Sequence, residues 1–275
     1  MEYIEVHIAF KSTIPWMEIV ITYLSNEGFE SFTEKKKVLK AYIPKDNYKE
    51  SQLVCLTEFK NHISDYSIQT IKDQNWNAEW EKHFDPVYVG DSLAILAPFH
   101  NQDITHQLKI IIQPQMSFGT GHHQTTWLAS KRMLTLALKG AKVLDMGTGT
   151  GVLAILAEKL GAASIFAPDI DEWSYRNAIE NCQLNNCSIV DVALGTHLLI
   201  ANKQFDVIIA NINKNVLLAQ FEQYALSSIV GTKLLISGFF TTDINDLVLA
   251  AKKHGFIFEK EFSKDEWALL EFVKQ

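Results

Sequence analysis

The stretch from Val143 to Gly151 constrains the fold of this chain more than any other. Two apolar residues lead into Asp145, and the residues from 152 to 160 are apolar at helical spacing. Between them three glycines stand at alternate positions: Gly147, Gly149 and Gly151. The pattern predicts a strand, a tight turn and a helix, because glycine tolerates left-handed backbone and lets a ligand approach closely. The start of the helix would present free N–H groups, so we expect a ligand at this turn.

The spacing of these glycines discriminates between ligands. A dinucleotide fingerprint needs a third glycine where Val152 stands, and a phosphate loop needs a lysine after its last glycine. Asp145 would repel a pyrophosphate and attract a cationic amino group. Asp169 follows a second apolar run, where a carboxylate binds ribose hydroxyls in such folds. A ligand with a ribose, a cationic amino-acid end and no phosphate is S-adenosyl-L-methionine. The alternative is a turn that only permits close packing of strand and helix.

Strands and helices alternate on both sides of this turn. Apolar strands that alternate with helices predict a parallel sheet covered on both faces, and the last two strands predict an antiparallel hairpin on that sheet. The predicted strands comprise residues 92–97, 107–112, 163–167, 188–192, 205–210, 233–237, 256–262 and 267–272. The predicted helices comprise residues 125–138, 152–160, 172–184, 216–229 and 244–254.

Residues 1–73 predict a separate, smaller domain. The pattern runs strand, helix, strand, strand, helix, strand, over residues 3–10, 14–27, 29–34, 38–43, 46–61 and 66–72. We expect Asp46 to cap the second helix. This order is that of a ferredoxin-like α+β unit. The unit carries no cluster of catalytic residue types, so we expect it to serve recognition.

Residues 74–90 predict a linker helix between this unit and a cofactor-binding domain over 91–275. Trp76, Trp80 and Phe84 are spaced by four, which puts three aromatic rings on one face of a short helix. We interpret this stripe as the docking face of a connecting helix. A partner-binding helix is the alternative.

Charge and cysteine content restrict the partners and the compartment. The net charge of −7 argues against nucleic acid as the main ligand, since phosphate binding needs a basic face. The 3 cysteines include no CxxC pair, which favours a reducing compartment. No secretory signal is visible, and no stretch approaches the ~20 apolar residues of a membrane helix. We therefore expect a cytoplasmic protein without a membrane partner, acting as a monomer.

Three stretches together carry a family resemblance. They are the string Phe118–Thr126, the turn Val143–Gly151 continued to Ala163, and the aromatic linker with Pro86; Ala210-Asn211-Ile212 agrees. In these stretches the chain resembles the ribosomal protein methyltransferase A (PrmA-type) family. The resemblance implies a Rossmann-like, seven-stranded class I methyltransferase domain behind a small ferredoxin-like domain. It also implies methylation, up to trimethylation, of α-amino and lysine ε-amino groups of large-subunit ribosomal protein eleven, free or on the ribosome.

The resemblance also assigns residues. It implies that the cofactor is contacted by Thr126, Gly147, Asp169 and Asn211. Phe118, with the loop over 119–121, would cover the methionine end. Asp145 and Gly149 join these candidates from the turn itself. We expect no metal, because the adjacent histidines His122 and His123 have no carboxylate at ligand spacing; they read as loop residues, or one of them accepts a proton.

Asn211 is our candidate catalytic residue. It ends a buried strand at the edge of the sheet where ligands bind, and its side-chain carbonyl would accept a hydrogen bond from the attacking amine. The alternative is a turn residue that bonds its own backbone. The chain departs from the family pattern at Pro168, at Ala167 and in the polar run Asn213–Asn215, which affects the backbone near the adenosine and the shape of the acceptor site.

Other functions remain open from the sequence. One is an S-adenosyl-L-methionine-dependent methyltransferase of another protein, a small-molecule amine or nucleic acid. Another is a nicotinamide-dependent oxidoreductase, which the glycine spacing disfavours. A third is a non-catalytic binding module that keeps the fold.

Overall fold

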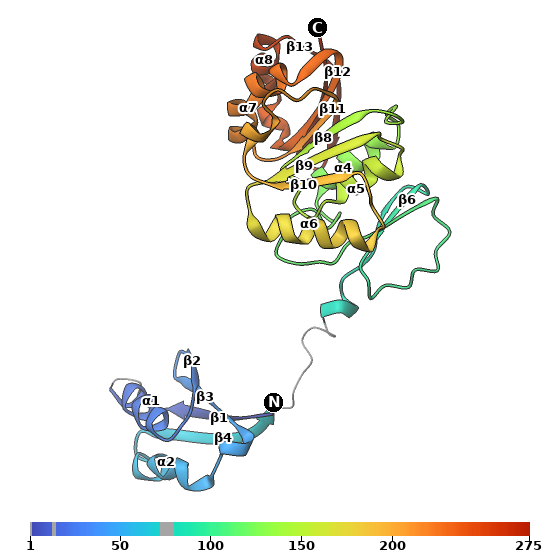
Figure 1. Cartoon of the computed structure of the whole chain (residues 1–275). Coiled ribbons are helices and arrows are strands. Elements are labelled where there is room, and N and C mark those ends of the chain that lie inside the picture. Colours follow the sequence, from blue (N-terminus) through green and yellow to red (C-terminus); the bar gives the residue numbers. More distant parts are fainter. Residues whose placement is uncertain (1, 13–14, 72–79) are drawn as a thin grey trace. The chain divides into compact units, whose positions relative to one another are not determined.

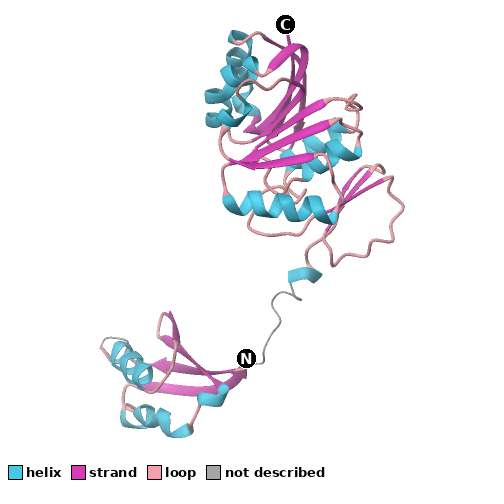
Figure 2. Ribbon diagram, viewed as in Figure 1, coloured by secondary structure: helices cyan, strands magenta, loops and turns pink. Residues whose placement is uncertain are grey.

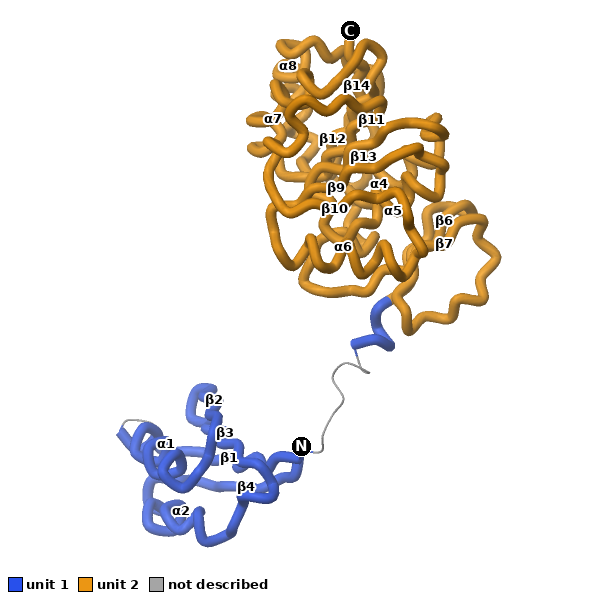
Figure 3. The backbone as a smooth tube through the Cα atoms, viewed as in Figure 1, with its two compact units in different colours: residues 1–84 blue, residues 85–275 orange. Residues whose placement is uncertain are grey.

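The computed structural model describes residues 2–12, 15–71 and 80–275, and the chain divides into two compact units (Figure 1). Figure 3 shows the units, residues 1–84 and residues 85–275. The predicted boundary at residue 73 lies outside the described residues, so the predicted domain limits stay predictions. Trp76 of the predicted aromatic stripe also lies outside them. The rings of Trp80 and Phe84, four residues apart, lie 4.8 Å from each other.

The first unit is a four-stranded antiparallel sheet with the order β2-β3-β1-β4. Alternate residues of β1, from Ile4 to Phe10, are buried with side chains of α1 and α2 in one apolar core. This is the predicted ferredoxin-like arrangement, and the prediction is confirmed. Its elements are β1 (Tyr3–Phe10), α1 (Trp16–Asn26), β2 (Ser31–Lys35), β3 (Val38–Pro44), α2 (Val54–Glu58) and β4 (Ile63–Ile71).

The predicted second helix, capped by Asp46 and continuous to residue 61, is wrong. The chain instead forms two short 3₁₀ turns, η1 (Lys45–Asn47) and η2 (Glu50–Leu53), and then the single-turn α2. Asp46 lies inside η1, and the backbone at Lys49 is extended. Gln52 stabilises this break, because its side chain accepts from the Lys49 N–H at 2.6 Å and donates to the Glu27 carbonyl at 2.7 Å.

The second unit is built on a seven-stranded sheet with the order β10-β9-β8-β11-β12-β14-β13 (Figure 2). The first five strands of this order run parallel, and β14 is antiparallel to both of its neighbours. The strands are β8 (Lys142–Met146), β9 (Ser164–Asp169), β10 (Val190–Leu194), β11 (Phe205–Asn211), β12 (Ser228–Phe240), β13 (Phe256–Lys264) and β14 (Trp267–Lys274).

Helices cover both faces of this sheet, as predicted. The helices α4 and α5 lie on one face and α7 and α8 on the other (Figure 1). Val143 and Leu144 of β8 show the alternation: the first belongs to the apolar core that includes residues of α4 and α5, and the second belongs to the core that includes residues of α7 and α8. The helices are α4 (Gln124–Met133), α5 (Val152–Lys159), α6 (Glu172–Leu184), α7 (Lys214–Leu226) and α8 (Ile244–Lys253), with 3₁₀ turns η3 (His197–Ile200) and η4 (Thr241–Asp243).

A three-stranded sheet precedes the large one and packs against the same core. Its strands are β5 (Val87–Val89), β6 (Leu93–Leu96) and β7 (Leu108–Ile111). The sequence predicted β6 and β7 but not β5, whose three residues are too few for a periodic pattern. Across the ranges that the structure describes, no helix is long and apolar enough to cross a membrane.

Candidate active site

A cavity of about 420 Å³ opens at the carboxyl edge of the parallel strands. The ends of β8, β9 and β11 contribute Gly147, Asp169 and Asn211 to its lining. This edge is where open α/β sheets bind ligands, because the loops and helix N-termini converge there. The full lining consists of Phe118, His123, Thr125, Met146, Gly147, Gly149, Pro168, Asp169, Ile170, Ser174, Gly195, His197, Asn211, Ile212, Asn213, Val216, Gln220, Gly238 and Trp267.

The glycine turn is fastened to the loop that begins at Phe118. Gly149 has φ +56°, and a Cβ atom there would lie 2.2 Å from the Phe118 carbonyl oxygen. The Thr150 N–H donates to that same oxygen at 2.9 Å, and the Thr150 hydroxyl donates to the Gly119 carbonyl at 2.6 Å. Only glycine fits at 149, because both the left-handed backbone and the close approach exclude a side chain.

Asp169 joins the end of β9 to the glycine turn. Its Oδ2 accepts from the Gly149 N–H at 2.8 Å, and its Oδ1 accepts from the Asp171 N–H at 3.0 Å. The carboxylate is 9% exposed, lines the cavity, and keeps lone pairs for further donors. The preceding Pro168 contributes its carbonyl, which accepts from the Gly147 N–H at 2.9 Å. The proline therefore supplies the acceptor that the turn requires.

Asp145 lies behind the turn and does not line the cavity. Its Oδ2 accepts from the Thr148 hydroxyl at 2.6 Å and from the Ala154 N–H at 3.1 Å, which ties the turn to the start of α5. The side chain is 1% exposed, and burial raises its pKa from 3.8 to about 6, helped by the negative charge of Asp169.

Asn211 lies at the end of β11 with one half of its amide unused. Its Nδ2 donates to the Thr126 hydroxyl of α4 at 3.3 Å. Its Oδ1 is buried and has no hydrogen-bond partner among the described residues. A buried carbonyl without a donor costs about 1–3 kcal/mol, so this geometry reserves an acceptor for a ligand. Thr126 itself is fully buried and does not line the cavity.

His123 lines the cavity and caps the N-terminus of α4. The Thr125 N–H donates to Nδ1 at 3.3 Å, and the Thr125 hydroxyl lies 2.8 Å from the same nitrogen. Nδ1 is therefore the acceptor and Nε2 carries the proton. Burial lowers the pKa of His123, so the ring is neutral near pH 7. This tautomer leaves no lone pair at Nε2, which argues against a proton-accepting role for His123.

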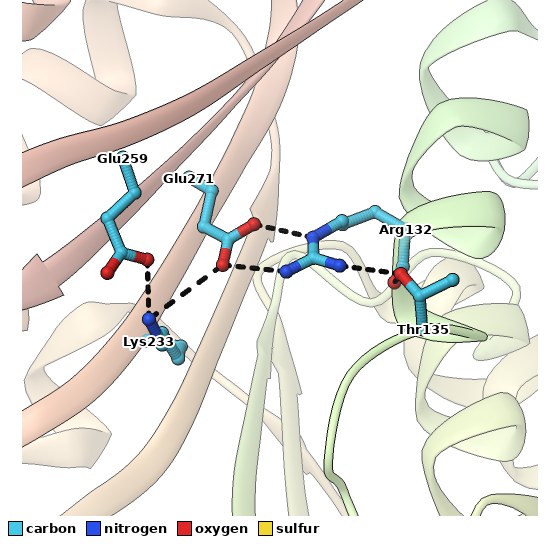
Figure 4. Close-up of polar contacts among 5 residues, drawn as sticks. All are labelled: Arg132, Thr135, Lys233, Glu259 and Glu271. Carbon is cyan, nitrogen blue, oxygen red and sulfur yellow. Dashed lines mark hydrogen bonds and ion pairs between the residues drawn. The ribbon is translucent and has the colours of Figure 1, made fainter.

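A buried ion pair clamps α4 to β14 (Figure 4). The Arg132 guanidinium reaches both oxygens of Glu271, with Nε–Oε2 at 2.5 Å and Nη2–Oε1 at 2.8 Å. Lys233, which also pairs with Glu259, lies 4.0 Å from Glu271. Burial alone would raise the pKa of Glu271, but the Arg132 guanidinium outweighs it and the pKa lies below its usual value. The clamp fixes the helix that carries His123 against the strand that begins with Trp267.

The polar residues that follow Asn211 stabilise the start of α7. Asn213 lines the cavity and caps the helix, since its side chain accepts from the Val216 N–H at 3.1 Å. Lys214 pairs with Asp243 at 2.8 Å and Asp246 at 2.7 Å and does not line the cavity. The departure from the family pattern therefore anchors α7 to α8 and leaves one polar side chain at the site.

Five of the seven predicted site residues line one cavity: Phe118, Gly147, Gly149, Asp169 and Asn211. Thr126 and Asp145 lie behind it and contact lining residues or the turn.

The sequence did not single out Ile170, His197 or Trp267, which also line the cavity. Ile170 directly follows Asp169, so the sequence could have indicated that it lies near the site. Trp267 reaches the site through pairing of β14 with β12, which no local pattern reveals. The expected absence of a metal stays a prediction.

Comparison with known proteins adds an independent finding. The family described as "Ribosomal protein L11 methyltransferase (PrmA)" matches residues 16–275. The ribosomal protein L11 methyltransferase of Porphyromonas gingivalis is 43% identical over 261 residues, covering 93% of this chain and 90% of that relative. The protein of the same description from Phocaeicola vulgatus is 39% identical over 279 residues, covering 99% of each. A crystal structure of ribosomal protein L11 methylase from Lactobacillus delbrueckii subsp. bulgaricus matches with a TM-score of 0.65 and 29% identity, covering 70% of this chain and 100% of that one.

Proposed function

The chain belongs to the ribosomal protein L11 methyltransferase family, and from that membership we propose that it transfers methyl groups from S-adenosyl-L-methionine to amino groups of ribosomal protein L11. The acceptors are the α-amino group and lysine side chains, methylated up to three times. One observation carries the proposal: the unpartnered Oδ1 of Asn211, buried at the lining of the cavity. An amine that enters this cavity supplies the N–H donor that this oxygen lacks.

The lining fits the cofactor. The Asp169 carboxylate, already held by two backbone N–H groups, has lone pairs left for the two ribose hydroxyls. The side chains of Thr148 and Thr150 bond to Asp145 and to the Gly119 carbonyl and do not line the cavity, so the turn presents only Gly147 and Gly149 to the amino-acid portion. Phe118 covers that end from its loop. Behind the lining, Asp145 accepts a hydrogen bond from the Thr148 hydroxyl of the turn, and the Thr126 hydroxyl accepts one from the Asn211 amide. When bound, the cofactor supplies the methyl group on a sulfonium, which needs no metal to become an electrophile.

Asn211 orients the nucleophile. The amine must be neutral to attack, although a free lysine has a pKa of about 10.4 and an α-amine about 8. The amine nitrogen uses its lone pair to form the new C–N bond as the C–S bond breaks. The mono- and dimethylammonium products each lose a proton to solvent before the next round, whereas the trimethylammonium product has no proton to lose and keeps its charge. The Asn211 carbonyl accepts an N–H without adding charge, so the amine can rotate between rounds. The main contribution of the protein is alignment.

The test compares Asn211→Ala with Thr126→Val. We expect Asn211→Ala to lower the rate of methyl transfer to L11 by about 100-fold, as losing one preorganised polar group at a reacting centre does. Thr126→Val, which removes only the acceptor of the Asn211 amide, should cost about tenfold or less. Intact-mass spectrometry follows the transfer and calorimetry follows cofactor binding. Near-normal transfer by Asn211→Ala with unimpaired cofactor binding would remove Asn211 from the mechanism.

We further propose that residues 1–73 capture the substrate, that 74–90 connect, and that 91–275 catalyse, with the monomer acting in the cytoplasm on free or ribosome-bound L11. No nucleic-acid readout is required for this. The three free cysteines, Cys55, Cys182 and Cys187, are consistent with a reducing compartment. Mass spectrometry of L11 from cells with and without this enzyme tests the substrate. An unchanged mass would reject L11 and leave the cofactor assignment standing.

A further inference from the structure

Three aromatic side chains that line the cavity contact one another in a row. The ring centroids of Phe118 and His123 lie 5.1 Å apart, and those of His123 and Trp267 lie 4.5 Å apart, both edge to face. All three residues line the cavity. Phe240 backs this wall, with its centroid 4.3 Å from that of Trp267. We call Phe118, His123 and Trp267 the aromatic wall.

The sheet order places this wall on the acceptor side. The residues that fit the cofactor end β8 and β9, Asn211 ends β11, and the sheet continues through β12 to β14. Trp267 begins β14 and pairs with Phe240 at the end of β12. Asn211 therefore lies between the cofactor residues and Trp267 along the edge of the sheet. The aromatic wall therefore extends from Phe118, which contacts the glycine turn, past Asn211 to Trp267.

The wall carries no formal charge. His123 is neutral and protonated on Nε2, for the reasons given above. Among the described residues that line the cavity, Asp169 is the only acid and there is no Lys or Arg. A cation on the acceptor side would therefore meet aromatic side chains and the Asn211 carbonyl, with no opposing carboxylate among the described lining residues. Aromatic faces attract cations that lie within about 6 Å of the ring centroid.

The acceptor changes its chemistry at each round. A neutral primary amine has two N–H donors, its monomethyl form has one, and its dimethyl form has none. The Asn211 carbonyl can therefore hold the amine in the first two rounds and cannot hold it in the third. The positive charge, meanwhile, moves onto the nitrogen during every transfer. Something other than a hydrogen bond must position the late intermediates.

We propose that the aromatic wall is a binding subsite for methylated ammonium groups: it retains the mono- and dimethylammonium products until each loses its proton to solvent, and it then stabilises the positive charge that develops on the nitrogen during the next transfer. This inference rests on the proposed function, because it concerns successive methylation at the same site. Asn211 and the wall then act in complementary rounds: the hydrogen bond dominates the first transfer, and the ring faces dominate the last.

The first experiment measures the order of products. Trp267→Leu keeps an apolar side chain and removes the ring face; Trp173→Leu is the matched control, since Trp173 is 61% exposed and does not line the cavity. Time-resolved intact-mass spectrometry of L11 should show mono- and dimethylated species accumulating at least about threefold in Trp267→Leu, with the first transfer slowed less than the third. Trp267→Phe should restore the wild-type distribution. An unchanged distribution, or equal slowing of all rounds, overturns the proposal.

The second experiment does not depend on L11. Calorimetry with choline, a quaternary ammonium, and with its neutral isostere 3,3-dimethylbutanol probes the wall in the protein saturated with S-adenosylhomocysteine. We expect choline to bind about three- to tenfold more tightly than the isostere, and Trp267→Leu to abolish the difference. Equal affinities in the wild-type protein overturn the subsite. Absence of L11 methylation alongside a preference for choline would reject the proposed substrate and leave the subsite standing.

Discussion

Gly149 contacts both Asp169 and the loop that begins at Phe118. Its N–H donates to Asp169, its backbone has φ +56°, and its Cα faces the Phe118 carbonyl. We expect Gly149→Ala to separate the turn from the Phe118 loop, because a Cβ would lie 2.2 Å from that oxygen. The strain costs about 1–3 kcal/mol and weakens S-adenosyl-L-methionine binding by at least about tenfold. Calorimetry measures the affinity. Wild-type affinity would show that the loop does not shape the site.

Asp145 makes stability depend on pH in an unusual direction. Its pKa is raised by burial to about 6 in the folded protein and is near 3.9 in an unfolded chain. Below about pH 4 the Asp145 carboxyl is protonated in both the folded and the unfolded state. Between about pH 4 and 6 it ionises in the unfolded state and stays protonated in the folded state, so the free energy of unfolding falls as pH rises. Above about pH 6 it is ionised in both states, and the free energy of unfolding levels off. Two pKa units correspond to a loss on the order of 3 kcal/mol.

Urea unfolding of the wild type and of Asp145→Asn measures this effect. The asparagine carbonyl can accept the same two hydrogen bonds and does not ionise. The unfolding free energy of the wild type should therefore fall relative to that of Asp145→Asn between pH 4 and pH 6. Above pH 6 the difference between the two proteins should stay constant. A difference that is flat across this window would mean that Asp145 ionises normally in the folded state.

The sequence predicted the residues whose roles are local. Gly147 and Gly149 belong to one turn, and Asp169 follows an apolar strand at a fixed distance from it, so spacing alone identified them. The sequence could not show that Asp145 and Thr126 lie behind the cavity, since that depends on how α4 and α5 pack. Trp267 comes 120 residues after Gly147 in the chain and reaches the cavity only through strand pairing.

At the scale of elements, the Arg132–Glu271 clamp holds α4 in place across the sheet. Glu271→Gln leaves a guanidinium that is 10% exposed without its carboxylate, so we expect a loss of about 3–5 kcal/mol in unfolding free energy. Because the pKa of Glu271 is lowered, the stability it contributes is present above pH 4.5 and is lost as pH falls through its lower folded value. Urea titrations at pH 7 and pH 4 measure both effects.

The double variant Arg132→Met with Glu271→Leu is the matched control. Replacing both partners by apolar side chains leaves no buried charge, so it should be much less destabilising than the single change. A double variant as unstable as Glu271→Gln would show that packing, and not the ion pair, sets the stability of this contact.

Most elements of the sheet were predictable because apolar periodicity is a property of the strand itself. The strands β8, β9 and β11 agree in place with the runs that the sequence marks. The strand β12 contains the predicted run 233–237 but begins at Ser228, inside the predicted helix over 216–229. Errors arose where side chains from elsewhere decide the local backbone. The break at Lys49, which Gln52 stabilises through Glu27, interrupted a helix that composition alone favoured.

At the scale of the whole molecule, all residues that line the cavity belong to the second unit, residues 85–275. This unit contains both apolar cores of the large sheet. We expect residues 85–275 to fold alone and to bind S-adenosyl-L-methionine within about threefold of the full chain, since this unit has its own apolar cores and contains every described residue that lines the cavity. Methylation of L11 should fall at least about 100-fold, because the unit that we propose captures L11 is missing. Undiminished methylation would reject the recognition role of residues 1–73.

The position of β14 in the sheet imposes an order on folding. The strands β8 and β9 are close in sequence, so the segment that contains the glycine turn closes a short loop, whereas Arg132 and Glu271 are 139 residues apart. The strand β14 must also enter between β12 and β13. A refolding chain should therefore acquire cofactor affinity first and the Trp267 wall last, so that partly folded molecules bind the methyl donor before they can discriminate among its acceptors.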